Sequence, residues 1–107
     1  MLTSPQLIAS ERLIIDRRRR GLTQEQAAQA WGFSEWHYRM LEAGKRERSC
    51  PRIRIGKLKP HEAAFTLRRR EGLKRTELAV KVGVSCWWLT QMERGRVNPK
   101  RLIEFWS

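Results

Sequence analysis

The chain has 107 residues, enough for one ordinary domain or two very small ones. Lysine and arginine number 23 against 11 acidic residues, which gives a formal net charge of +12. So large a positive charge on so small a protein predicts a polyanionic partner, most often nucleic acid. It argues against the alternative that the basic surface serves only solubility.

The remaining composition excludes several classes of protein. Cys50 and Cys86 form no C-x-x-C pair and have no histidine cluster beside them, so neither a disulfide framework nor a zinc site is expected. The first residues lack a basic start followed by an apolar run, and no apolar stretch approaches membrane length. We therefore expect a cytoplasmic protein with no membrane contact, no metal, no cofactor and no small-molecule ligand.

The first predicted helix begins at Thr3 or Ser4, because Pro5 suits the first helical position and Thr3 with Gln6 fits a capping box. It ends at Gly21, after a run of arginines that complements the helix dipole. Apolar residues at helical spacing give it an inward face, formed by Leu7, Leu13 and Ile14.

Two shorter helices follow. Thr23, with Gln26 three residues later, caps the second helix, which ends at Gly32. Ser34 caps the third, which closes at Gly44. Small alanines allow two helix backbones to approach closely, and the expected inward residues are Ala27, Ala28, Trp31, Tyr38 and Leu41.

Residues 45–59 break this pattern. The run from Arg52 to Ile55 alternates as a short strand does, but a single strand has no partner here. We interpret the segment as an ordered basic linker, and a merely solvated spacer is the alternative. The expected boundaries are 1–46 for a first domain, 47–59 for the linker and 60–107 for a second domain.

The second domain restarts at Pro60 with a helix that reaches about Glu71. Shorter helices are expected at about 75–82 and 85–94, with Gly83 in the turn between them. A last helix starts at Asn98-Pro99, and its apolar face is expected to cover the gap between the domains or meet a second protomer. The expected inward residues are Ala63, Ala64, Leu67, Leu78, Ala79 and Val82 before the last helix, and Leu102, Ile103, Phe105 and Trp106 within it.

The two domains are copies of one unit. Ile14–Lys45 and Phe65–Arg96 align without a gap at an offset of about 51 positions, and roughly a third of the aligned positions are identical. Each copy reads as helix, glycine turn, helix, glycine turn, helix. This is the outline of a helix-turn-helix, and each copy is small enough that we expect the two to pack together.

The motifs resemble a known family. Residues 17–28 read Arg-Arg-Arg-Arg-Gly-Leu-Thr-Gln-Glu-Gln-Ala-Ala, and residues 83–96 read Gly-Val-Ser-Cys-Trp-Trp-Leu-Thr-Gln-Met-Glu-Arg-Gly-Arg. Both resemble the Cro/cI-type phage repressor helix-turn-helix, also called the XRE family. The resemblance implies an all-α fold with two tandem lambda-repressor-like units. Asp16, Lys74 and Arg75 depart from the family pattern, which has an apolar residue, Thr and Gln there.

The resemblance also implies roles for individual residues. The positions facing bases would be Glu35, Trp36, Met40, Cys86, Trp87 and Gln91. The positions facing phosphates would be Gln24, Ser34, Lys45, Arg46, Arg75, Ser85, Arg94 and Arg96. Two structural ion pairs would join the first and third helices of each copy, Arg17 with Glu42 and Arg68 with Glu93.

The base-facing residues differ in the base contacts that they can make. Gln91 can pair with adenine through two hydrogen bonds. Glu35 can accept from a cytosine amino group, or it can serve only the dipole of the first helical turn. Trp36 and Trp87, at matching positions, can contact thymine methyls and sugars or can pack against protein.

We therefore expect a sequence-specific regulator that binds double-stranded DNA, a phage or mobile-element repressor that occludes promoters. The C-terminal helix offers a possible homodimer contact through Phe105 and Trp106. No nucleophile with a base is present in the pattern, so an enzyme is not expected. Two alternatives stay open: an interaction module that binds a protein partner on the same scaffold, and an RNA-binding regulator.

Overall fold

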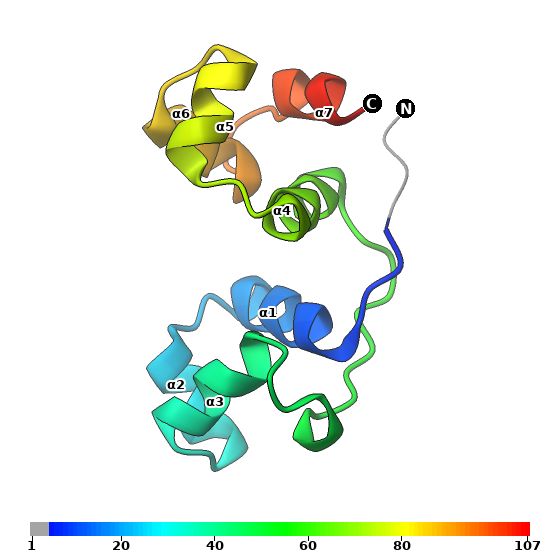
Figure 1. Ribbon diagram of the computed structural model, residues 1–107, viewed down its shortest axis with the longest axis vertical. Helices are drawn as coiled ribbons and strands as arrows, with labels where there is room; N and C mark the ends of the chain where they lie inside the picture. Colours follow the sequence, from blue (N-terminus) through cyan, green and yellow to red (C-terminus); the bar gives the residue numbers. More distant parts are fainter. Residues whose placement is uncertain (1–4) are drawn as a thin grey trace. The chain divides into compact units, whose positions relative to one another are not determined.

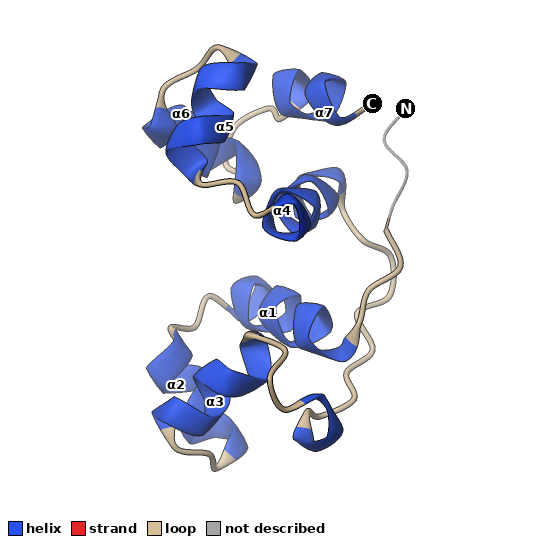
Figure 2. Cartoon of the chain, viewed as in Figure 1, coloured by secondary structure: helices blue, strands red, loops and turns tan. Residues whose placement is uncertain are grey.

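The computed structural model describes residues 5–107, so Thr3 and Ser4, the expected start of the first helix, lie outside it. Within this range the chain forms seven α-helices and one short 3-10 turn, with no strand (Figures 1 and 2). The prediction of an all-α fold is confirmed. The helices group into two compact units, Gln6–Gly56 and Lys57–Ser107.

The first unit holds α1 (Ala9–Arg20), α2 (Gln24–Trp31), α3 (Glu35–Glu42) and the 3-10 turn Glu47–Ser49. The predicted capping box of α2 is present, because the Thr23 hydroxyl accepts from the Gln26 amide and the Gln26 side chain accepts from the Thr23 amide. Gly32 ends α2 with φ +76°, a conformation that favours glycine. This glycine makes the turn between α2 and α3.

The predicted start of the first helix is wrong. Pro5–Ile8 is not helical, and α1 begins at Ala9. The cause is local, because the Glu11 carboxylate accepts from the Ile8 amide at 3.1 Å. A carboxylate at this position of the first turn satisfies an amide that has no partner within the helix, so the helix has its N-terminus there.

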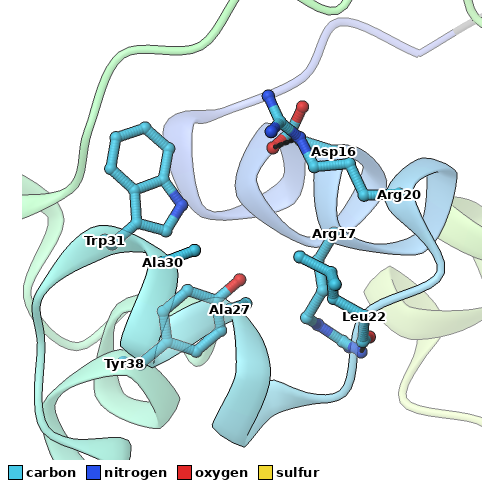
Figure 3. Close-up of a pocket in the computed structure, with 8 residues that line it drawn as sticks. All are labelled: Asp16, Arg17, Arg20, Leu22, Ala27, Ala30, Trp31 and Tyr38. Atoms are coloured by element: carbon cyan, nitrogen blue, oxygen red, sulfur yellow. Dashed lines mark hydrogen bonds and ion pairs between the residues drawn. The ribbon is translucent and has the colours of Figure 1, made fainter.

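The core of the first unit lies between its three helices. Trp31, which was expected to point inward, is 41% exposed, so that prediction is wrong. It is the last residue of the two-turn helix α2 (Figure 3), where fewer neighbouring side chains are available to cover it. The core consists of Leu13, Ala27, Ala28, Tyr38, Leu41 and Cys50.

The segment after α3 is ordered against the first unit. Cys50 is buried in its core, and Ile53 packs against the same cluster. The Arg19 guanidinium donates to the carbonyl oxygen of Ile55 at 2.6 Å. This part of the predicted basic linker is therefore no solvated spacer, and its alternating isoleucines bury one side of an extended segment without forming a strand.

The second unit holds α4 (Pro60–Glu71), α5 (Arg75–Val82), α6 (Cys86–Glu93) and α7 (Lys100–Trp106). The first three begin and end within one residue of their predicted bounds. α7 begins just after the predicted start, with the Asn98 carboxamide oxygen accepting from the Lys100 amide at 3.1 Å. The core consists of Ala64, Leu78, Ala79, Leu89, Met92 and Leu102.

The apolar face of α7 serves its own unit. α7 packs against α4 and α5, where Leu102 is fully buried and Trp106 covers the core cluster. The expectation that this face needs another domain or protomer to cover it is therefore wrong for most of its side chains. Phe105 is the exception, with 40% of its surface exposed.

Replacing Gly95, which follows α6, is expected to lower the stability of the protein measurably. Its φ is +73°, and a Cβ there would lie 2.7 Å from Cε1 of His61. Gly95→Ala is expected to lower the free energy of unfolding by about 1–3 kcal/mol, because both backbone strain and the imidazole ring oppose the methyl group. Chemical denaturation checks this against Gly83→Ala, where φ is +85° but no atom lies within 4 Å. Equal losses in the two variants would contradict a role for the histidine contact.

Candidate nucleic-acid interface

Ser34 and Ser85 stand directly before α3 and α6. Each hydroxyl oxygen accepts from a backbone amide in the first turn, that of His37 and that of Trp88, both at 3.1 Å. The hydroxyl proton of a serine that accepts in this way is still free to donate. Both side chains are exposed. Each can therefore cap its helix and donate to a phosphate oxygen at the same time.

The outer face of α3 carries a charged pair and a large ring. Glu35 forms an ion pair with Arg39, one helical turn later. Trp36 is 60% exposed, and the Arg46 guanidinium lies 5.2 Å from the centre of its ring. Met40 is partly exposed on the same helix. Two of the three base-facing positions predicted in the first unit, Glu35 and Trp36, thus have partners within the protein.

The corresponding face of α6 is uncharged. Trp87 is 64% exposed and Trp88 41%, with their ring centres 5.8 Å apart. Cys86 is exposed and has a free thiol, and Gln91 is partly exposed. Thr90 stands where the first unit has Arg39, and its hydroxyl donates to the Cys86 carbonyl oxygen at 2.9 Å. This surface offers aromatic rings and one carboxamide.

The first residues of α2 and α5 also differ in whether their side chains are engaged within the protein. The Gln24 carboxamide donates to Oε1 of Glu42 at 3.0 Å, so its amide protons are partly used. Arg75 occupies the matching position of the second unit and is exposed. A cation beside the amides of a helix N-terminus is suited to an anion. The other predicted phosphate-facing cations are exposed as well, namely Lys45, Arg46, Arg94 and Arg96.

Both predicted arginine–glutamate pairs lie within hydrogen-bonding distance. Nε of Arg17 lies 2.7 Å from Oε2 of Glu42, and Nε of Arg68 lies 2.7 Å from Oε2 of Glu93. A second guanidinium nitrogen of each arginine donates at 3.0 Å to the carbonyl oxygen of the leucine after the glycine turn, Leu22 or Leu73. Each arginine thus ties its helix to the C-terminal end of the third helix of its unit, α3 or α6, and to the turn.

Arg39 was not singled out from the sequence. It neutralises Glu35, which the sequence left as either a base reader or a support for the helix dipole. The signal was present, because an acid and a base four residues apart on a helix are neighbours. The pair leaves the outer face of α3 with little net charge at its N-terminal end.

The comparisons with known proteins agree with this geometry. Residues 66–103 match a family model described as a helix-turn-helix domain. The matched segment covers part of the second unit, from within α4 through α5 and α6 into α7, and it supports a DNA-binding role for that segment. No curated protein and no solved structure matches the chain.

Within residues 5–107 no helix combines the length and the apolar character needed to cross a bilayer. In the same range no three His, Cys, Asp or Glu side chains are grouped so that they could hold a metal ion.

Proposed function

We propose that the chain is a sequence-specific regulator that binds double-stranded DNA and represses transcription by occluding promoters, as phage and mobile-element repressors of the Cro/cI type do. The observation that carries this proposal is the helix-turn-helix match over residues 66–103, whose reading helix α6 is exposed and flanked by exposed arginines. An α-helix fits the major groove, where side chains meet base edges. The protein acts in the cytosol or nucleoid and needs no catalytic activity.

In this proposal α3 and α6 are both reading helices. Two readers on one chain can serve two half-sites about one helical turn, near 34 Å, apart. Their different side chains predict half-sites of different sequence. A homodimer through Phe105, the side chain of α7 that its own unit leaves exposed, would extend the site, and the mass of the protein in solution tests that step.

A titration at two salt concentrations tests the proposal. A promoter fragment and a random-sequence duplex are compared, and specific affinity is expected to survive an excess of random competitor. Phosphate contacts alone give affinity that does not depend on sequence and weakens steeply with salt. Absence of duplex binding even at low salt would contradict the proposal.

Gln91→Ala is expected to relax base preference at one position of the operator. A carboxamide that pairs with adenine through two hydrogen bonds contributes about 1–3 kcal/mol of discrimination against the wrong base. Selection of bound sequences from a random pool measures this, with Thr90→Ala on the same helix as the control. An unchanged sequence preference in the Gln91 variant would remove this residue from the reading set.

A protein partner is the second candidate. It is favoured by the exposed rings of Trp36, Trp87 and Trp88, since exposed aromatic side chains are enriched at protein interfaces. The same titration separates the two candidates, because an interaction module would not prefer a promoter fragment. Structured RNA, used as a competitor in that titration, tests the remaining alternative.

A further inference from the structure

The exposed face of α6 carries no charged side chain. Glu93 is the one charged residue of this helix, and its side chain is buried beside Arg68. Cys86, Trp87 and Trp88 are exposed in the first turn, and Gln91 is partly exposed one turn later. A duplex that meets this face therefore meets aromatic rings, a thiol and one carboxamide.

The absence of charge limits the bases that α6 can distinguish. In the major groove guanine is most often read by an arginine or a lysine, and the amino group of cytosine by a glutamate or an aspartate. Within α6 no such side chain is exposed. Adenine pairs with a carboxamide, and the C5 methyl group of thymine is contacted by apolar side chains. The side chains that α6 exposes therefore match both members of an A·T pair.

Trp87 is the aromatic side chain that α6 exposes most. It is 64% exposed, whereas Trp88 is 41% exposed, and the two ring centres lie 5.8 Å apart. Trp87 is the second residue of α6, and the N-terminal residues of a recognition helix are the ones that contact base edges. An indole ring gains affinity by covering apolar surface, and in the major groove the thymine methyl is the apolar group that base edges present.

Trp87 and Gln91 lie on one face of α6. They are four residues apart, so they are neighbours on the helix surface and are displaced by about 6 Å along its axis. Two steps along a DNA duplex advance about 6.8 Å. The two side chains thus span a distance that covers neighbouring base pairs of one half-site.

We propose that Trp87 is a specificity-determining residue that reads the C5 methyl group of a thymine, one or two base pairs from the adenine that pairs with Gln91. This role rests on the proposed DNA binding and adds to it the composition of the half-site, which is A·T at both positions. Contacts to phosphates position a protein on the duplex and carry no sequence information directly. Preference for thymine at this position therefore depends on Trp87, and the exposed arginines of the unit set only the overall affinity.

Uracil tests this contact, because it keeps every hydrogen-bonding group of thymine and lacks only the methyl group. Duplexes that the full chain selects from a random pool are resynthesised with deoxyuridine at one thymine at a time, and fluorescence anisotropy measures their affinities. One substitution is expected to weaken binding about threefold to fivefold, the loss that corresponds to one buried methyl group. Trp87→Ala is expected to bind the thymine and uracil duplexes equally at that position.

Trp36→Ala is the matched control, because Trp36 is the second residue of α3 and is 60% exposed. This variant is expected to keep the preference for thymine at the position that Trp87 reads. The uracil series on the natural protein needs no variant, so the test stands even if Trp87→Ala fails to fold.

Two results would overturn the role of Trp87 while leaving the proposed function in place. One is duplex binding that no uracil substitution weakens. The other is a preference for thymine that persists in Trp87→Ala, which would assign the methyl contact to another side chain. A natural protein that binds no duplex at low salt would instead contradict the proposed function, and the role of Trp87 with it.

Discussion

Replacing Arg68 by alanine is expected to destabilise the second unit by about 3–5 kcal/mol, because it leaves a buried carboxylate without its counter-charge. The Glu93 side chain is only 3% exposed, and that of Arg68 is 10% exposed. Arg68 also donates to the Leu73 carbonyl oxygen, so the turn after α4 loses a hydrogen bond as well. Denaturant unfolding followed by circular dichroism measures the loss.

Two control variants make this result specific. Arg69→Ala removes an exposed arginine from the same helix and is expected to change stability little. Arg68→Met combined with Glu93→Leu removes both charges and is expected to recover most of the stability, since an apolar pair of similar volume replaces a buried ion pair well. A double variant as unstable as Arg68→Ala would contradict this account.

The matching pair of the first unit is expected to be less sensitive. The Arg17 side chain is 20% exposed, and Glu42 also accepts from the Gln24 carboxamide. Glu42 would therefore keep one donor after Arg17→Ala.

Local signals in the sequence were sufficient for most helix boundaries. Thr23, Gly32 and Ser34 act through hydrogen bonds and dihedral angles that involve only neighbouring residues, so the pattern predicts them well. The predicted start of the first helix was wrong for an equally local reason. The Glu11 carboxylate accepts from the Ile8 amide, so the helix begins after Ile8 and not at Pro5.

Features that depend on tertiary packing were harder to predict. Trp31 has helical spacing from Ala27 and Ala28, yet its side chain is 41% exposed, because spacing along one helix does not tell which side chains the other helices cover.

The outer faces of α3 and α6 also could not be distinguished from the sequence by how many of their charges are free to bind a partner. The repeat presents them as equivalent, whereas the structure pairs Glu35 with Arg39, Gln24 with Glu42 and Trp36 with Arg46. The cations flanking α6 make no such interactions among the described side chains. Whether a charged side chain is free to bind DNA depends on the residues that surround it in the fold. The alignment of the two copies does not show those neighbours.

This difference predicts the salt dependence of DNA binding. Replacing Arg75, Arg94 and Arg96 together by alanine is expected to weaken binding to all duplexes alike and to reduce the slope of log K against log salt by roughly 2.7, about 0.9 for each phosphate that is no longer neutralised. Arg75 should matter most of the three, because the amides at the N-terminus of α5 attract the same phosphate. Fluorescence anisotropy over a series of salt concentrations measures the slope.

The matched variant changes Gln24, Lys45 and Arg46 in the first unit. It removes only two cations, one of which lies over the Trp36 ring, so the slope should fall by roughly 1.8 at most. The carboxamide of Gln24 already donates to Glu42, and its removal should add nothing to the salt dependence. If the first-unit variant lowers the slope more than the second-unit variant does, the first unit makes the main phosphate contacts. The inference that the second unit makes the larger share of the phosphate contacts would then be wrong.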